Sequence, residues 1–195
     1  MLSTCFHAHS KPFAACTRRV APVAFLLAGA ALFASCPAAR AQGSIIPVRV
    51  KVGILNASDG DVRRSVGTPL FQGEVDVALP STSPGKTYVS VGYMERRKNG
   101  GTFRVVPLTI SRVYSPPNPA SRLTGNVYTG AGIGAYLLHA SGGGDSENKT
   151  TIGGFVVVGY QFPTPYFVEA KYHQTAGGVK SLSPNGLAIS AGYRF

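Results

Sequence analysis

The chain has 195 residues, of which 44% are hydrophobic and only 14% are charged, and its formal net charge is +11. This length fits one folded domain, and the charged fraction lies well below the usual quarter of residues. Beyond the N-terminal region no apolar run reaches the ~20 residues of a membrane helix, which excludes a helical membrane domain there.

Residues 1–41 have the pattern of a secretory signal peptide. Three basic residues precede an apolar core at Val20–Ser35, and Ala39-Arg40-Ala41 fits an A-x-A cleavage site. We therefore expect an exported chain whose mature domain covers residues 42–195 and begins near Gln42.

All three cysteines, Cys5, Cys16 and Cys36, lie within this leader. The mature chain would then have no disulfide and no cysteine metal site. Two alternatives stay open for the leader. It could be an N-terminal anchor helix, or Phe33-Ala34-Ser35-Cys36 could be a lipobox in which Cys36 is acylated.

From Gln42 onward, apolar residues alternate with polar or small ones in eight stretches, and a period of two is typical of β-strands. The clearest is the last, where Leu187, Ile189 and Ala191 share one face with Tyr193 and Phe195. The expected strands are Val48–Leu55, Leu70–Leu79, Thr87–Arg96, Thr102–Tyr114, Asn126–Leu138, Thr151–Gln161, Tyr166–His173 and Leu187–Phe195.

The connections between these stretches are rich in turn-forming residues, above all Ser141–Lys149. The strand lengths suit a tilted bilayer crossing of ~9–11 residues. An even number of strands would place both ends of the mature chain on one side. We therefore predict an all-β fold, an eight-stranded antiparallel up-and-down barrel. Pro107 lacks a ladder donor, so we expect a bulge or a strand start near it.

Alternation alone does not say which face meets lipid, since a soluble eight-stranded barrel such as a lipocalin has the same pattern turned inside out. Here one face carries the charges and the other is almost wholly aliphatic. Aromatics lie toward the strand ends, as an interfacial girdle requires: Tyr93, Tyr114, Tyr193 and Phe195. With export, this favours a transmembrane β-barrel over a soluble periplasmic ligand-binding barrel.

Four passages occur in an order that resembles the small bacterial outer-membrane β-barrel superfamily, the OmpA-type and OmpW-type transmembrane domains. They are Val106–Ile110, the glycine-rich Asn126–Tyr136, Tyr166–Tyr172 and Gly186–Phe195. The resemblance covers roughly residues 48–195. It implies location in the cell outer membrane and contact with outer-membrane lipid. It also implies that the barrel-assembly machinery reads the closing strand, with Tyr193 and Phe195, as an insertion signal.

Seven charges lie on the polar faces of the first, second, seventh and eighth strands: Arg49, Lys51, Glu74, Asp76, Glu169, Lys171 and Arg194. Barrel closure would bring these strands together, so we expect all seven charges in one sector of the lumen. Charges in a confined interior persist only if paired, and eight strands leave just enough room for side chains. We predict a lumen plugged by ion pairs, with a narrow channel for small solutes as the alternative.

Arg96, Arg97 and Lys98 follow the third strand in a loop that we expect to face outside. Three adjacent cations could bind lipopolysaccharide phosphates through charge-assisted contacts. The alternative is an ordinary solvated basic turn.

Gly130, Gly132 and Gly134 fit neither a Walker loop nor G-x-G-x-x-G, and we interpret them as space for large neighbours inside the barrel. The segment Asn56–Asp61 offers oxygen ligands. It lacks the spacing and the closing Glu of a calcium loop, so we expect a plain loop.

His139 with Ser141, and His173, lie near the outer strand ends, but no carboxylate is placed to orient either histidine. We therefore predict no enzyme, no cofactor and no metal. Nucleic-acid binding is not expected, because no aromatics are interleaved with the basic residues and the chain is exported. A monomeric barrel with a structural or surface-interaction role remains, presenting loops 56–69, 97–101, 139–150 and 174–185 outside.

Overall fold

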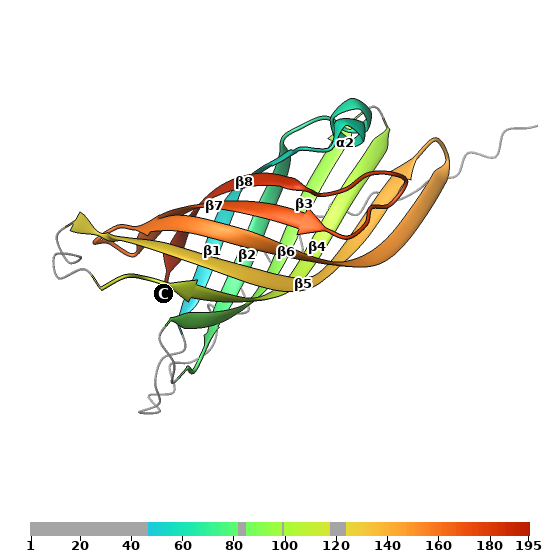
Figure 1. Cartoon of the computed structure of the whole chain (residues 1–195). Coiled ribbons are helices and arrows are strands. Elements are labelled where there is room, and N and C mark those ends of the chain that lie inside the picture. Colours follow the sequence, from blue (N-terminus) through green and yellow to red (C-terminus); the bar gives the residue numbers. More distant parts are fainter. Residues whose placement is uncertain (1–46, 82–84, 99, 118–123) are drawn as a thin grey trace, which may run out of the picture. The chain divides into compact units, whose positions relative to one another are not determined.

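The computed structural model describes residues 47–81, 85–98, 100–117 and 124–195. The predicted signal peptide and Cys36 lie outside these residues. Strands dominate the described chain (Figure 1). The elements are β1 (Val48–Ala57), α2 (Gly60–Ser65), β2 (Leu70–Leu79), β3 (Lys86–Lys98), β4 (Gly101–Tyr114), β5 (Asn126–Gly142), β6 (Asp145–Gln161), β7 (Tyr166–Thr175) and β8 (Gly186–Arg194). No helix in the described ranges is long and apolar enough to cross a membrane.

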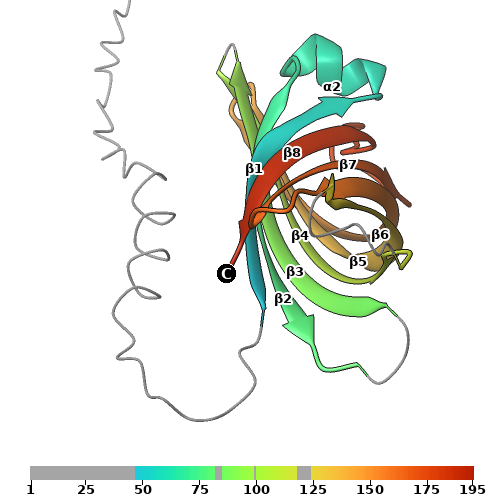
Figure 2. The same cartoon turned by 90° about the vertical axis from the view of Figure 1, so that its left-hand side faces the viewer.

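Each strand pairs antiparallel with the next, and β1 closes the sheet by pairing with β8, from Arg49 opposite Arg194 to Ala57 opposite Gly186. Figure 2 shows the strands wrapping around a common interior. The eight-stranded antiparallel barrel predicted from the alternation is therefore confirmed. We call the end where β1 begins and β8 ends the terminal end. The opposite end, which carries α2 and the β7–β8 connection, is the loop end.

The predicted loop at Ser141–Lys149 is wrong. There β5 continues to Gly142 and β6 begins at Asp145, so the two strands are joined by a two-residue turn at Gly143 and Gly144. Both turn glycines have positive φ angles, of 65° and 91°, which a tight hairpin turn requires. This hairpin extends the wall of the barrel at the loop end, and the expected external loop 139–150 is largely strand.

The expectation of a bulge or strand start at Pro107 is also wrong. The β3–β4 register is the same on both sides of it, with Val91 opposite Leu108 and Met94 opposite Val105. Pro107 faces Gly92 across the ladder, and a Cβ added to Gly92 would lie only 2.8 Å from the proline Cγ. A glycine on the neighbouring strand therefore accommodates the proline ring within a continuous sheet.

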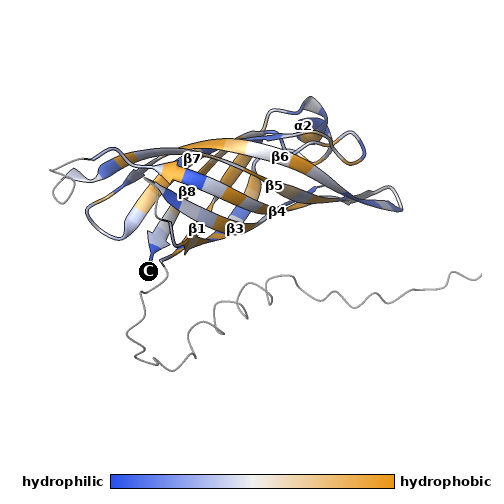
Figure 3. Cartoon of the chain, turned by 60° about the horizontal axis from the view of Figure 1, so that its bottom comes forward, coloured by the Kyte–Doolittle hydropathy of each residue, from blue (hydrophilic) through white to orange (hydrophobic). Residues whose placement is uncertain are grey.

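The outer wall of the barrel is an aliphatic belt. Ile133 and Ile152 are 69% and 73% exposed on it. Figure 3 shows the hydrophobic residues along the strands. The belt consists of Val50, Val52, Val89, Val91, Leu108, Ile110, Ile133, Ile152, Val156, Val158, Val168 and Ile189. At the terminal end the aromatics Tyr166, Tyr193 and Phe195 stack edge to face, as a girdle at the belt's border would.

The inside of the barrel at the loop end is filled by an apolar cluster, which we call the apolar cap. It consists of Leu55, Ala57, Val62, Val66, Leu70, Met94, Phe103, Val105, Tyr136, Leu138, Ala140, Val179, Leu182 and Ala188. Helix α2 contributes Val62, and the β7–β8 connection contributes Val179 and Leu182. These connections are folded over the barrel end, so they bury apolar side chains that would otherwise face water.

Asp59 explains how α2 is held in place. Its carboxylate accepts a hydrogen bond from the Asp61 amide at 2.8 Å as an N-cap, and another from the Ser183 amide at 2.9 Å. The oxygens of the Asn56–Asp61 segment thus serve a helix cap and a loop contact. Among the described residues no group of three or more His, Cys, Asp or Glu side chains could hold a metal ion.

Candidate functional site

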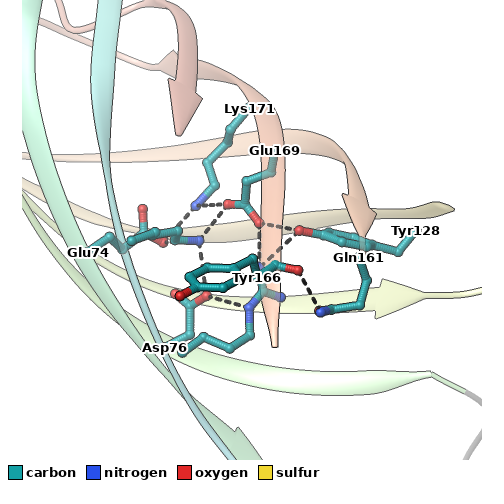
Figure 4. A network of polar contacts seen from close by, with 9 residues as sticks. Glu74, Asp76, Tyr128, Gln161, Tyr166, Glu169 and Lys171 are labelled. Carbon is teal, nitrogen blue, oxygen red and sulfur yellow. Dashed lines mark hydrogen bonds and ion pairs between the residues drawn. The ribbon is translucent and has the colours of Figure 1, made fainter. Parts of the chain in front are cut away.

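Six of the seven predicted lumen charges meet inside the barrel (Figure 4). Each is at most 5% exposed, and three cations balance three carboxylates. We call this set the charge network: Arg49 and Lys51 on β1, Glu74 and Asp76 on β2, Glu169 and Lys171 on β7. Buried ion pairs therefore occupy the barrel interior.

Lys51 lies at the centre of the charge network. Its Nζ is 2.5 Å from Glu169 Oε1, 3.0 Å from Asp76 Oδ2 and 3.1 Å from Glu74 Oε1. Lys171 Nζ donates to Glu74 Oε1 at 2.7 Å, and Arg49 Nη2 donates to Glu169 Oε2 at 2.6 Å. Every member is paired with an opposite charge, which is the condition under which charges tolerate burial.

Strand register explains why these side chains meet. Arg49 lies opposite Asp76 and Lys51 opposite Glu74 on adjacent strands. Strand β8 separates β1 from β7, but it presents Ser190 and Gly192 to the lumen beside Glu169 and Lys51. Because these two residues are small, the side chains of β1 and β7 reach each other across β8.

Aromatic rings surround Arg49 on the terminal side of the network. Its guanidinium carbon lies 4.0 Å from the Phe167 ring centroid and 5.0 Å from that of Tyr88. The Tyr128 hydroxyl accepts from Arg49 Nη2 at 3.1 Å and donates to Glu169 Oε2 at 2.9 Å. These contacts add cation–π attraction and fix the guanidinium in one orientation.

Arg194, the seventh predicted member, does not join the network. In the register of β1 and β8 its backbone lies opposite Arg49, at the last position of the ladder. Its side chain is exposed there, at the terminal end. The strand alternation places it on the lumen side, but the barrel wall ends there. Its position corrects the expectation of seven clustered charges.

A second polar contact lies between the charge network and the rest of the apolar cap. The Tyr136 hydroxyl lies 3.0 Å from His173 Nδ1, and the His173 ring lies beside Phe155, with centroids 5.5 Å apart. A Cβ on Gly132 would come within 2.6 Å of the Phe155 ring, so this glycine does make room for a large neighbour as predicted. The lumen is thus filled from the charge network to the loop end.

The basic triplet is not the single loop patch that we expected, because β3 continues to Lys98. Side chains alternate between faces along a strand. Arg97 therefore lies outward, exposed, in ion-pair contact with Glu95, whereas Arg96 is on the opposite face and its Nε is buried. Three consecutive strand residues cannot form one surface, and the triplet is split.

Arg97 belongs instead to an outward-facing cluster that the linear sequence did not reveal. Glu95 accepts hydrogen bonds from Tyr93 Oη and Arg97 Nε, and from Arg104 Nε at 3.1 Å. We call Tyr93, Glu95, Arg97 and Arg104 the outer-wall cluster. Glu95 and Arg104 are nine residues apart and meet only because the β3–β4 register places them opposite each other.

The two histidines that the structure describes make contacts other than those of a nucleophilic site. Exposed His139 contacts the Asn148 amide oxygen, with 2.7 Å between Nδ1 and Oδ1. Buried His173 contacts Tyr136. Across the described ranges neither histidine makes a hydrogen bond or ion pair with a carboxylate, which a Ser-His-Asp arrangement requires.

The solved structures to which this chain is similar include bacterial outer-membrane barrels. Neisserial surface protein A matches with a TM-score of 0.56 and 18% identity, over 76% of this chain and 94% of its own. The Yersinia pestis outer membrane protein Ail, determined in a phospholipid bilayer nanodisc, matches with a TM-score of 0.50 and 14% identity, over 77% of this chain and 100% of its own. The N-terminal β-barrel domain of Pseudomonas aeruginosa OprF matches with a TM-score of 0.48 and 14% identity, over 76% of this chain and 97% of its own.

This chain has the outer-membrane barrel fold. At these levels of identity the likeness shows the fold alone. No protein-family model matches the sequence, and no curated protein matches it.

Glu169 is paired with both Arg49 and Lys51, so replacing its carboxylate by a neutral group should greatly reduce the stability of the fold. Glu169→Gln leaves two buried cations short of a counter-charge, so we expect the free energy of unfolding to fall by about 3–5 kcal/mol. Urea unfolding of the refolded protein in detergent would measure it. Glu147→Gln, which removes an exposed carboxylate from β6, should change it by less than about 0.5 kcal/mol. Equal unfolding free energies for the two variants would contradict the network's role.

Proposed function

We propose that the protein is exported by its N-terminal segment 1–41 and spans the cell outer membrane as a barrel with a closed lumen. The aliphatic belt carries this proposal. Ile133 and Ile152 are largely exposed on the outer wall, while the charges of the strand centres lie inside. Exposing such an apolar surface to water is unfavourable, whereas contact with lipid acyl chains is favourable. The fold shared with Ail in a phospholipid bilayer agrees with this placement.

The inside of the barrel argues against the soluble alternative. A lipocalin-like protein needs an apolar cavity for its ligand. Here the middle of the lumen holds ion pairs, and the described side chains at the loop end pack together in the apolar cap. A narrow channel is likewise disfavoured, because the apolar cap fills the lumen toward the loop end.

We infer that the protein acts through its surface at the loop end, with the terminal end in the periplasm. The β1–β2 connection with α2 and the β7–β8 connection lie at this end. Neisserial surface protein A, by its name, is a surface protein of the same fold. The packed lumen and the connections folded over the loop end support a structural or surface-interaction role. At the terminal end Tyr193 and Phe195 are 37% and 70% exposed, accessible to the barrel-assembly machinery as an insertion signal.

Arg97 and Arg104 of the outer-wall cluster give this surface a specific ligand class. They face outward just beyond the aliphatic belt, toward the loop end, where the outer leaflet's headgroups would lie. Guanidinium groups bind phosphates in charge-assisted, often bidentate geometry. Glu95, which accepts from both arginines, holds them in place. We therefore propose that this cluster, rather than the contiguous triplet, contacts lipopolysaccharide phosphates.

Location is tested by fractionating cells that express the full chain and running the fractions on a gel with and without boiling. We expect the protein in the outer-membrane fraction and a faster or slower band in the unboiled sample, because a closed barrel resists mild detergent. A chain that begins at Gln42 should stay out of that fraction. A soluble species whose mobility does not change on boiling would contradict the proposal.

Lipopolysaccharide contact is tested with the double variant Arg97→Ala/Arg104→Ala. Loss of two charge-assisted contacts should weaken binding to lipopolysaccharide-containing vesicles about ten- to hundredfold or more. Vesicle flotation at several concentrations would measure this. The control Arg63→Ala/Arg64→Ala removes two exposed cations from α2 at the same end. If both double variants bind like the unchanged protein, the outer-wall cluster is not the contact.

A further inference from the structure

A cavity of about 300 Å³ lies at the mouth of the lumen at the terminal end, beyond the charge network. Its floor includes Arg49 and Tyr128, and its sides include Tyr88 from β3. At the rim, Lys86 and Arg194 are exposed to solvent. The volume is in the range of small-molecule sites. In the part of the chain that the structure describes, the apolar cap packs the other end of the lumen, so the cavity opens at the terminal end.

The lining of this pocket is rich in hydrogen-bond donors. Of the described residues, three cations line it, Arg49, Lys86 and Arg194, and no carboxylate side chain does. Arg49 is paired within the charge network. By contrast, over the part of the chain that the structure describes, the side chains of Lys86, Arg194 and Tyr88 make no hydrogen bond or ion pair. Three side-chain donors therefore line one pocket, and none of them is bonded to another described side chain.

The charge network does not offset these cations. Its three positive groups and three carboxylates neutralise one another, and the carboxylates point at Lys51, Lys171 and Arg49. The rim cations thus keep a net positive field at the mouth. A concave surface with low-dielectric walls focuses such a field and attracts anions.

We propose that this pocket binds a phosphate or carboxylate group through Lys86, Arg194 and the Tyr88 hydroxyl, above the floor formed by Arg49. Lysine offers a point charge and arginine a planar fork, which together suit an oxyanion. The rest of the 300 Å³ accommodates a small organic group attached to it. The site depends neither on the outer-wall cluster nor on which compartment the terminal end faces.

The proposal is tested by titrating the folded full-length protein in zwitterionic detergent at low salt with inorganic phosphate, and separately with citrate. Amide NMR shifts report the site. We expect saturable shifts at Lys86, Tyr88 and Arg194, lost as salt is raised. Absence of saturable shifts at these residues with either anion overturns the proposal.

Variants separate a built site from general positive charge. Lys86→Gln/Arg194→Gln should weaken phosphate binding about ten- to hundredfold, and Tyr88→Phe should weaken it several-fold. Both rim residues are exposed, so folding should be retained. The control Arg63→Gln/Arg64→Gln removes the same charge at the loop end and should leave the affinity unchanged. An equal loss in the control overturns the proposal.

The anion's carrier is identified in nanodiscs. If a lipid headgroup is the natural occupant, phosphatidylglycerol discs should compete with inorganic phosphate, and phosphatidylcholine discs should not. If a soluble anion is the occupant, phosphate should bind equally in both kinds of disc. Either result is expected of an oxyanion site, and it tells whether the anion belongs to a lipid or to a soluble molecule. If phosphate binds in neither kind of disc, the proposed site is overturned.

Discussion

The buried pairing of Lys51 with three carboxylates is the constraint on which the barrel depends. An unpaired charge in the lumen would cost several kcal/mol, so β1, β2 and β7 must lie at the distances that the ion pairs require. The pairs of Lys51 and Arg49 with Glu169 on β7 form only when β8 closes the sheet between β1 and β7, with small residues facing inward. Closure therefore completes the charge neutralisation that β1 and β2 begin, and it leaves the aliphatic faces of the strands outward.

The interior is consequently organised in layers. The apolar cap fills the loop end, the Tyr136–His173 contact follows, the charge network lies below it, and a cationic pocket opens at the terminal end. The described side chains pack this lumen as a core, which supports our proposal of a closed barrel. The recognition that we propose then uses surfaces that the strands hold in place: the outer-wall cluster, the connections at the loop end and the rim of the pocket.

The strands and the six network charges were predictable because a period of two assigns every side chain to a face. Features that depend on strand ends or on neighbouring strands were not. Arg97 was predicted in a loop, but β3 continues beyond the last apolar residue of that strand. Ser141–Lys149 was also predicted as a loop, but the backbone of β5 and β6 pairs there without an apolar face. Arg194 lies on the predicted face but beyond the wall. Pro107 is tolerated only through Gly92, a partner that the register alone identifies.

The central claim is that the aliphatic belt contacts acyl chains, and tryptophan fluorescence tests it most directly because the chain has no tryptophan. Ile133→Trp would place a single reporter on the belt, and Asp145→Trp would place one at the β5–β6 turn of the loop end. In bilayers with brominated acyl chains, we predict strong quenching for the first variant and little for the second. An unquenched reporter at position 133 in the folded protein would contradict the account.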